Sequence, residues 1–541
     1  MSMQIRARSA VWGLALALTA AAGAGGWAQS PDSAVLRVGE RKVTRADLDR
    51  YLLQYFGKPG VEQLIDHAVI ESEAERLKVE VSPEEADEAL TAARTQANVQ
   101  FQAALKAEGI TEETWKERAR FYLLAEKVLD AKWPVKEQDL VRLSVRYARL
   151  QNENVARNVI KQARNGANFQ TLVLQWSEDK ERAGMVQPDP FLRVENPAFF
   201  KMAEKLRVGQ VTPQPIQSGE FWLVVKLEKQ LAPNTLSTKE RELAQRKVKA
   251  FRTAALLPST RRRFKIEYPT VVASLVSDPR LPNSTPVAVV TPTAKTGGEA
   301  RTFSRGQLLS YLLTHYGARS LDRLAERSLV EQEAQRLRVG VSEAELNARV
   351  GEAKGASRIL FDEALKGEGI TEEAFKERLR YLYLAERVLA AREPLAPEEL
   401  ERLTVRAVRV KTRAEAEQLL QRLGMGARFE DAVRLVSLDR GGDGLLQPRA
   451  FLSIDNPTVF KAVGDTPEGA ILPEPLQVEG FWYVLRLEKR HPAPTLTGRE
   501  RENALRRIYA PRIGKLLEAL RADYSVEQAV PLKTLISEAA G

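Results

Sequence analysis

The sequence predicts an α+β fold that is predominantly helical, arranged as two tandem modules that each hold a helical domain with an inserted α+β domain. The first reason is an internal repeat, because the hexapeptide Glu-Gly-Ile-Thr-Glu-Glu at residues 108–113 occurs again at 368–373, 260 residues later. The second reason is that helix-type apolar spacing, as at 61–77, alternates with short strand-like segments such as 221–227. A gapless offset that holds over roughly 200 residues indicates a duplicated module rather than a solenoid of short repeats.

The first residues have the pattern of an export signal. Arg6 and Arg8 precede a run of small and apolar residues at 10–24, and the tripeptide Gly-Trp-Ala at 26–28 resembles a cleavage site. We expect residues 1–28 to be a signal peptide, because the apolar run is too short and too rich in Ala and Gly to span a bilayer comfortably. We therefore expect an exported protein with no integral membrane span after cleavage, periplasmic or, as the alternative, secreted.

Composition narrows the possible partners and cofactors. The chain has no cysteine and only three scattered histidines, which excludes disulfides, a lipidated cysteine and the usual zinc sites. Its 82 basic residues are interspersed with 72 acidic ones, so the formal charge of +10 indicates a solvated surface rather than a concentrated basic patch. We expect no metal, no cofactor and no nucleic-acid partner.

The first helical part is predicted from strand and capping signals. Residues 34–43 alternate around a Gly-Glu pair and predict a hairpin, and Thr44 is placed to cap the helix that follows. An apolar stripe over 61–77 predicts a core-facing helix. His67 lies beside this stripe, and its counterpart in the repeat is Arg327, which predicts an exposed position rather than a ligand.

The repeated hexapeptide predicts a corner between two helices. Gly109 suits the end of one helix, and Thr111 suits the N-cap of the next. Glu112 and Glu113 then lie at the positive end of that second helix, where their charge is favourable. These roles explain the composition of the hexapeptide without a catalytic one.

From residue 143 the pattern becomes that of a compact α+β domain. Residues 235–263 then return to a charged helix, 264–268 predict a closing strand, and the proline-rich stretch 269–286 predicts a linker. The predicted boundaries are a signal peptide at 1–28, helical domain 1 at 29–142, α+β domain 1 at 143–232, a completing helix and strand at 233–268, a linker at 269–286, helical domain 2 at 287–402, α+β domain 2 at 403–492, and a completing helix and strand at 493–541.

Two sequence blocks in each α+β domain carry a family resemblance. The pattern Gly-x-x-Phe at 166–169 is followed by Ser-Glu-Asp at 177–179, and in the second copy Gly-x-x-Phe at 426–429 is followed by Ser-Leu-Asp at 437–439. Residues 440–445 then read Arg-Gly-Gly-Asp-Gly-Leu. These blocks resemble the SurA/PrsA-type periplasmic foldases, in which a parvulin-type peptidyl-prolyl isomerase domain is inserted in a helical chaperone domain. The resemblance implies unfolded or extended polypeptides as partners.

The chain departs from the family pattern at the catalytic positions. The resemblance implies a histidine in the first strand and another in the last strand of an active parvulin. The first-strand positions hold Arg149 and Arg409, and the last-strand positions hold Leu223 and Tyr483. Asp179 and Asp439 match the family's third position, where a structural capping role is the competing interpretation. We therefore expect isomerase activity to be weak or absent.

The aromatic wall of the parvulin pocket is retained in part. Because side chains of a strand alternate between two faces, we expect about half of these aromatic residues to belong to the core and the rest to bind extended apolar peptides. The candidates for peptide binding are Phe191, Phe199, Phe200, Phe221 and Trp222 in the first copy and Phe451, Phe460, Phe481 and Trp482 in the second.

These observations predict an exported, ATP-independent chaperone or foldase for unfolded envelope or secreted polypeptides. One alternative is a working prolyl isomerase that uses Asp179 or Asp439 with partners other than histidine. A second alternative is an envelope adaptor that uses the duplicated modules to bind one dedicated partner.

Overall fold

The computed structural model describes residues 31–97, 99–278, 280–293, 298–356, 358–439 and 444–540. The expected signal peptide and residues 440–443 of the glycine-rich loop lie outside this part of the chain. Among the described residues, no helix combines the length and the apolar character that a membrane span requires.

The chain divides into two compact units, and the division crosses the boundaries expected from the sequence. Of the described residues, unit 1 takes those within Phe56–Gly317 and Leu535–Gly541, and unit 2 takes those within Ala28–Tyr55 and Ala318–Thr534. Helices predominate in both units, and both contain antiparallel sheets. The α+β, predominantly helical class is therefore confirmed.

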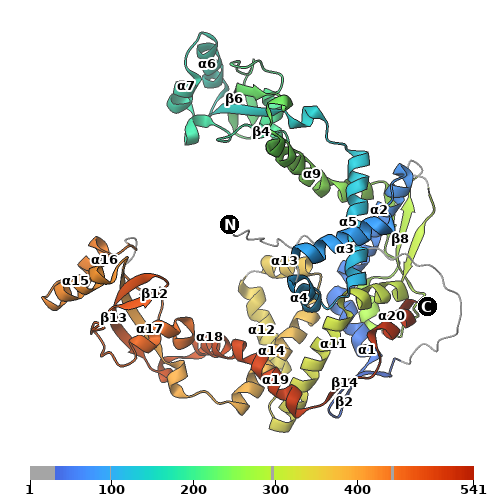
Figure 1. Ribbon diagram of the computed structural model, residues 1–541, viewed down its shortest axis with the longest axis vertical. Helices are drawn as coiled ribbons and strands as arrows, with labels where there is room; N and C mark the ends of the chain where they lie inside the picture. The colour runs from blue at the N-terminus through green and yellow to red at the C-terminus, as the bar shows by residue number, and fades with distance from the viewer. Residues whose placement is uncertain are drawn as a thin grey trace. The chain divides into compact units, whose positions relative to one another are not determined.

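The helical part of unit 1 is built around helix α2, whose buried stripe is the predicted one. Val61, Ile65 and Val69 are at most 3% exposed, because helical spacing places them on one side. Figure 1 shows α9 reaching from this part to the α+β domain of the unit. The elements are α2 (Lys58–Leu77), α3 (Pro83–Ala97), α4 (Val99–Glu108), α5 (Glu112–Lys132), α9 (Thr238–Arg261), β7 (Phe264–Glu267), α10 (Val272–Ser277), β8 (Pro286–Pro292), β9 (Arg301–Ser304) and α20 (Leu532–Ala540).

The predicted helix corner is confirmed in both copies of the hexapeptide. Gly109 and Gly369 both have a φ of 70°, in the left-handed region that glycine adopts without strain. The hydroxyl of Thr111 accepts the backbone N–H of Thr114 at 3.2 Å, and Thr371 caps its own helix in the same way. The hexapeptide therefore terminates one helix and starts the next.

The first sheet domain, residues 142–231, inserts between α5 and α9. Its strands lie in the order β4-β3-β6-β5, and each neighbouring pair is antiparallel. Helices α6 and α7 cover one face of the sheet, and α8 covers the other. The elements are β3 (Arg142–Leu150), α6 (Glu153–Arg164), α7 (Phe169–Trp176), β4 (Phe191–Leu192), α8 (Pro197–Ala203), β5 (Ile216–Ser218) and β6 (Phe221–Leu231).

Unit 2 contains the second sheet domain, residues 402–491, with the strand order β11-β10-β13-β12. Helix α11 (Arg305–Leu337) contributes to unit 2 beyond Gly317. The other elements are β1 (Ala34–Val38), β2 (Arg41–Thr44), α1 (Arg45–Leu52), α12 (Glu343–Ala356), α13 (Arg358–Glu368), α14 (Glu372–Arg392), β10 (Arg402–Val410), α15 (Arg413–Gly424), α16 (Phe429–Leu435), β11 (Phe451–Leu452), α17 (Pro457–Ala462), β12 (Leu476–Val478), β13 (Phe481–His491), α18 (Gly498–Tyr509), α19 (Ile513–Asp523) and β14 (Val526–Gln528).

The closing strands pair differently from the expectation that each completes its own module. In unit 1, β7 pairs with β8 of the second repeat, and in unit 2, β14 pairs with β1 of the first repeat. The registers correspond, because Ile266 lies opposite Val290 and Val526 lies opposite Val38. Since the two hairpins are equivalent, either pairing satisfies the backbone N–H and C=O groups, and the sequence pattern does not distinguish the two. The expectation of self-contained modules is corrected to an exchange of strands.

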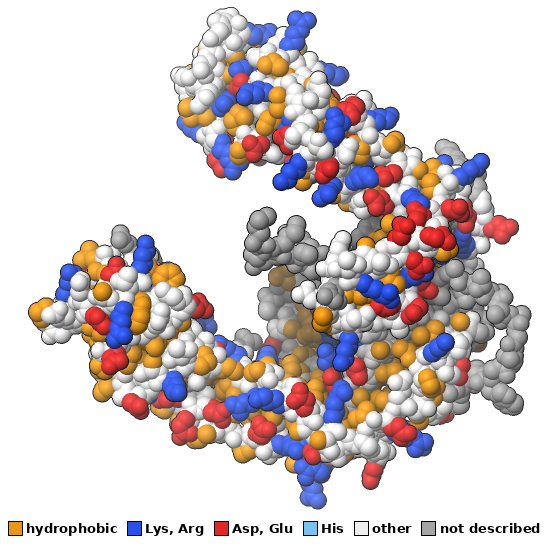
Figure 2. Space-filling model, in the orientation of Figure 1, with side chains coloured by type: hydrophobic (Ala, Val, Ile, Leu, Met, Phe, Trp, Pro, Cys, Tyr) orange, Lys and Arg blue, Asp and Glu red, His pale blue; other side chains and the backbone are white. Residues whose placement is uncertain are grey.

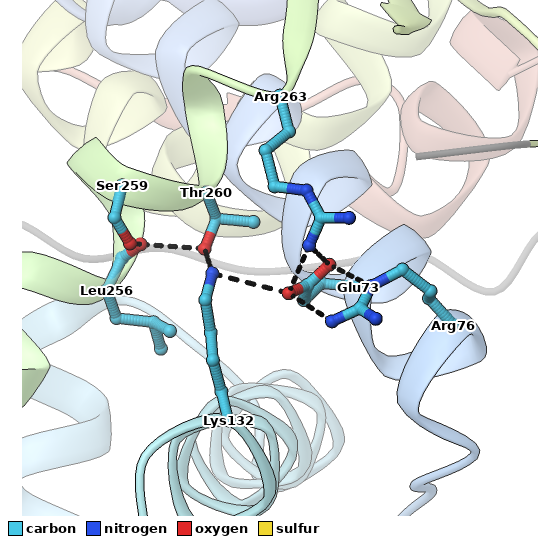
Figure 3. A network of polar contacts seen from close by, with 7 residues as sticks. All are labelled: Glu73, Arg76, Lys132, Leu256, Ser259, Thr260 and Arg263. Carbon is cyan, nitrogen blue, oxygen red and sulfur yellow. Dashed lines mark hydrogen bonds and ion pairs between the residues drawn. The ribbon is translucent and has the colours of Figure 1, made fainter. Parts of the chain in front are cut away.

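A buried carboxylate joins the two helices that hold the first sheet domain to α2 (Figure 3). The side chain of Glu73 has no exposed surface, and it accepts hydrogen bonds from Arg76 and Arg263, with Lys132 Nζ 3.3 Å away. Lys132 ends α5 and also donates to Thr260 Oγ1, at 2.8 Å, near the end of α9. The carboxylate of α2 therefore contacts residues at the ends of both α5 and α9, the two helices that connect the first sheet domain to the helical part.

Two local expectations from the sequence are wrong. His67 is 3% exposed, and its ring stacks on Phe121 with centroids 3.8 Å apart. Burial lowers the pKa of His67 well below its ordinary value. Arg327 at the equivalent position suggested an exposed residue. That arginine is instead partly buried and forms ion pairs with Glu331 and Glu377 of unit 2. The expected linker also contains helix α10, which buries Leu275.

Candidate functional site

The two positions expected to be catalytic in the first sheet domain are direct neighbours across the sheet. Strands β3 and β6 are antiparallel, and their register places Arg149 opposite Leu223. The two positions that the family resemblance indicated thus lie side by side in the sheet. Within the described chain, no histidine lies there, because His67 and His315 are in helices and His491 lies at the end of β13.

The site lies on the sheet face that α8 covers, called here the α8 face. Leu223 and Val225 of β6 form the core of this face together with Phe200 of α8. Tyr147 is partly buried in the same cluster, and Arg149 follows it by two residues, so both side chains point to the α8 face. The opposite face packs on α6 and α7 and has no share in the site.

A tyrosine that the sequence motif did not single out contacts the third candidate position. The phenolic hydroxyl of Tyr147 donates a hydrogen bond to Asp179 Oδ2, and the backbone N–H of Glu181 donates to Asp179 Oδ1 at 3.1 Å. Burial and this hydrogen bond raise the pKa of Tyr147 to about 12. The same hydrogen bond lowers the pKa of Asp179. Both oxygens of the carboxylate are therefore engaged by neutral donors.

Backbone geometry explains how Asp179 reaches the sheet. The backbone N–H of Arg149 donates to Ser177 Oγ at 3.0 Å, and the carbonyl of Arg149 accepts the N–H of Glu178 at 2.8 Å. The same serine oxygen accepts the N–H of Asp179 at 3.2 Å. These hydrogen bonds attach the Ser-Glu-Asp block to the end of β3. Asp179 also accepts the backbone N–H of Glu181, so it has the structural role in a turn that is the alternative to a catalytic role.

Arg149 contributes a positive charge over an aromatic ring. Its guanidinium carbon lies 4.5 Å from the ring centroid of Phe221, a distance at which a cation is attracted by the ring face. Its Nε atom is buried, and no described residue accepts a hydrogen bond from it. No carboxylate of the described chain lies within 4.0 Å of this guanidinium, in contrast to many other arginines of the protein.

The second sheet domain repeats the backbone arrangement with different side-chain partners. Arg409 lies opposite Tyr483, and its guanidinium lies 4.7 Å from the ring centroid of Phe481. The counterpart of Tyr147 is Ala407, which has no hydroxyl. Here Arg409 itself pairs with Asp439, with a distance of 2.7 Å between Nη2 and Oδ1.

The predicted peptide-binding aromatics divide into three groups. Phe191, Phe200 and Phe451 are at most 3% exposed and belong to the core, which corrects their assignment as contacts for a client. Trp222 and Trp482 pack against the helices on the opposite face of each sheet. The half-buried phenylalanines on the side of the expected site are Phe199, Phe221, Phe460 and Phe481.

The surroundings of the site are mixed in character. Figure 2 shows hydrophobic, basic and acidic side chains interspersed on the visible face of the first sheet domain. In the part of the chain that the structure describes, no group of three or more His, Cys, Asp or Glu residues has a metal-binding arrangement. The site thus offers an aromatic ring, a cation and a tyrosine–carboxylate pair.

Comparison with known proteins agrees with the sequence motifs. Residues 140–229 match the family model described as Rotamase, the PPIC-type PPIase domain. The chain is 24% identical over 266 residues to foldase protein PrsA 2 of Listeria monocytogenes serotype 4b (strain F2365), a match that covers 47% of this chain and 85% of that protein. It is 28% identical over 202 residues to foldase protein PrsA 2 of Bacillus anthracis, covering 35% of this chain and 68% of that protein. A crystal structure of peptidylprolyl isomerase (PrsA) from Bacillus anthracis shares 24% identity, with 36% of this chain and 94% of that chain covered and a TM-score of 0.28.

Proposed function

We propose that this chain, which is a foldase of the SurA/PrsA type with a PPIC-type parvulin domain at residues 140–229, is an exported chaperone that binds unfolded polypeptides without ATP. The foldase names of its relatives support polypeptide clients. The half-buried ring of Phe221 beside Arg149 is the observation that carries the proposal, because it offers apolar surface and hydrogen-bond donors to an extended chain.

We expect little prolyl isomerase activity from this site. Rotation about a peptide bond meets a barrier of about 18–20 kcal/mol, and a catalyst must bind the twisted amide better than the planar forms. Leu223 has no hydrogen-bonding group, and Arg149 brings a charge and a larger shape than the expected histidine. The degenerate site is therefore better suited to holding a segment than to twisting it.

The second sheet domain is proposed to be a further parvulin-like domain, and the two halves of the chain to be tandem copies. The shared strand order and the equivalent pairs Arg149–Leu223 and Arg409–Tyr483 support this assignment. Two weak sites on one chain increase the overall affinity for a long client, since the second contact forms at a high effective concentration.

An aggregation assay tests the chaperone proposal. A chemically denatured client is diluted into buffer with and without an equimolar amount of the mature protein, and light scattering is followed without nucleotide. We expect the protein to slow the rise in scattering. Scattering that rises equally fast with the protein and with serum albumin as control would refute the chaperone proposal.

A working isomerase is the second candidate function, and the Tyr147–Asp179 pair favours it. The pair supplies Asp179 with a partner other than histidine at the expected site. A refolding assay limited by proline isomerisation decides between the candidates. Acceleration that disappears in Asp179→Ala, with the fold retained by circular dichroism, would make the isomerase the better account, whereas the chaperone proposal predicts little acceleration by either protein.

A further inference from the structure

The charge of Arg149 is available to a ligand because a neighbouring tyrosine occupies the carboxylate that could neutralise it. Asp179 receives the hydroxyl of Tyr147 on one oxygen and the backbone N–H of Glu181 on the other. Among the described residues, no carboxylate reaches within 4.0 Å of the Arg149 guanidinium. Its Nε is buried without an acceptor in the described chain, as is the Nε of Arg409 in the second sheet domain, so the two arginines differ only in the pairing of the terminal nitrogens.

The second sheet domain has a different residue at the position of the tyrosine and a different pairing of the arginine. Ala407 stands at the counterpart of Tyr147, and Asp439 then pairs with Arg409 at 2.7 Å. The arginine, the aspartate and the phenylalanine under the guanidinium are otherwise equivalent in the two domains. The presence or absence of one hydroxyl group thus accompanies the difference between an unpaired and a paired arginine.

We propose that Arg149 makes the first sheet domain selective for client segments that carry a carboxylate next to an apolar or aromatic residue, and that the second sheet domain lacks this selectivity. The inference rests on the proposed function, because it names the class of segment that the same site takes. The guanidinium would donate to the carboxylate while the ring of Phe221 contacts the apolar neighbour. Arginine suits this role because its planar fork matches the two oxygens of a carboxylate.

The location of Arg149 favours binding over simple surface attraction. A guanidinium lying on an aromatic ring is partly desolvated, and an ion pair formed there is weakened less by water than one between exposed side chains. The charge of Asp179 opposes an incoming anion, because its two neutral hydrogen-bond donors stabilise this charge without cancelling it. Arg149 already interacts with this charge at longer range, so a ligand carboxylate has to compete through a direct contact with the guanidinium. Binding should nevertheless decrease as salt rises, because the site is not fully buried.

A pair of matched peptides tests this selectivity on the full mature chain. The probes are fluorescein-labelled Gly-Phe-Glu-Pro-Phe-Gly amide and the same peptide with Gln in place of Glu, followed by fluorescence anisotropy. A third probe keeps Gln and has a free C-terminal carboxylate, which separates a side-chain carboxylate from a chain terminus. We expect the Glu peptide to bind about tenfold more tightly than the Gln amide, the size typical of one charge-assisted hydrogen-bonded contact.

Variants locate the preference at one arginine. Arg149→Gln should reduce the Glu-over-Gln preference to about twofold or less. Tyr147→Phe should do the same, because Asp179 becomes free to pair with Arg149. Ala407→Tyr should increase the amount of Glu peptide bound at saturation, since it releases Arg409 from Asp439. Arg157→Gln, which removes an exposed charge of α6, is the matched control and should leave the preference intact.

The outcomes separate this inference from the proposed function. Equal binding of the Glu and Gln peptides, or a preference that survives Arg149→Gln, would overturn the selectivity while a positive aggregation assay leaves the chaperone function standing. A tenfold preference that is lost in Arg149→Gln and Tyr147→Phe supports it. If neither peptide binds, the selectivity is refuted, and the aggregation assay then decides separately whether the chaperone function is refuted as well.

Discussion

Tyr147 donates its phenolic hydrogen to Asp179, and this bond joins the central strand of the first sheet to the turn that follows α7. The second sheet domain has Ala407 at the equivalent point, and its aspartate pairs with Arg409 instead. The two domains share their strand order and carry the same arginine and aspartate, but they pair these charges differently. The replacement of Tyr147 by Ala407 accompanies this difference.

The ionisation of Tyr147 provides a spectroscopic check of this bond. Burial and the bond to Asp179 raise its pKa from 10.0 to about 12. Between pH 10 and 12 the unfolded chain loses this proton while the folded chain keeps it, so the contribution of Tyr147 to stability falls as pH rises through that window. The tyrosinate absorbance of the protein minus that of Tyr147→Phe should therefore titrate near pH 12. In Asp179→Asn the same difference should move toward 10, and a midpoint that stays near 12 would contradict the bond.

The exchange of closing strands predicts which engineered cysteines form a disulfide. The chain has no native cysteine, so each pair can be tested alone. Arg37 lies opposite Glu527, and Glu267 lies opposite Val289. Facing residues of antiparallel strands have the Cα separation that a disulfide requires. We expect Arg37→Cys with Glu527→Cys to oxidise readily within one chain, as shown by its mobility on a non-reducing gel.

The matched control for the exchange joins each hairpin to the closing strand of its own repeat. Arg37→Cys with Glu267→Cys should remain reduced under the same conditions, since the two residues belong to different sheets. Efficient intramolecular oxidation of this control, together with failure of the first pair, would show self-contained modules and reject the exchange.

Local signals in the sequence specify the helix ends and strands, but they do not specify which hairpin each closing strand joins. Local capping signals predicted the helix corner at Gly109. The family resemblance indicated Arg149 in the first strand and Leu223 in the last strand, and the register of the sheet places them opposite each other. The strand exchange was not predictable, because both hairpins are equally good partners for either closing strand. The role of Tyr147 was missed for another reason: the family motif drew attention to Arg149, two residues further along the same face. The sequence did contain a signal for this contact, because Tyr147 is a polar residue on the strand to which the turn with Asp179 is attached.

Two phenylalanines of the first sheet domain should separate stability from binding. Phe191 is 1% exposed, so Phe191→Ala should lower the free energy of unfolding by about 3–5 kcal/mol through lost burial and a cavity. Phe221 is half-buried under Arg149, so Phe221→Ala should cost about 1 kcal/mol or less in stability. We expect Phe221→Ala to weaken client binding several-fold. Unimpaired client binding in a folded Phe221→Ala variant would remove this ring from the site.

The carboxylate of Glu73 should contribute to the stability of the helical part of unit 1. Burial by itself raises the pKa of Glu73, but hydrogen bonds from Arg76 and Lys132 outweigh it and lower the pKa below its ordinary 4.5. The stabilisation is therefore present above pH 4.5 and is lost as pH falls below it. Because the surrounding cations keep some exposure, we expect Glu73→Gln to cost about 2–3 kcal/mol, less than a fully buried pair.

Hydrogen exchange of the amides in α2 measures the local stability that Glu73 contributes. A local measurement is needed because a chain of several domains does not unfold in a single two-state transition. Glu153→Gln, which breaks an exposed pair on α6, is the control and should change stability by less than about 0.5 kcal/mol. If the amides of α2 exchange equally slowly in Glu73→Gln and in the control, the polar network in Figure 3 does not stabilise the packing of α2 against α5 and α9.

Direct binding of an unfolded polypeptide is the measurement that tests the central claim most closely. A reduced, carboxymethylated protein that cannot fold is labelled with a fluorophore and titrated with the mature chain in the absence of nucleotide, with its folded, disulfide-intact form as the control. The account predicts a saturable rise in anisotropy for the unfolded form and none for the folded form. If the anisotropy of the unfolded form does not rise, or if it rises equally for the unfolded and the folded form, the protein is not a chaperone that selects unfolded chains.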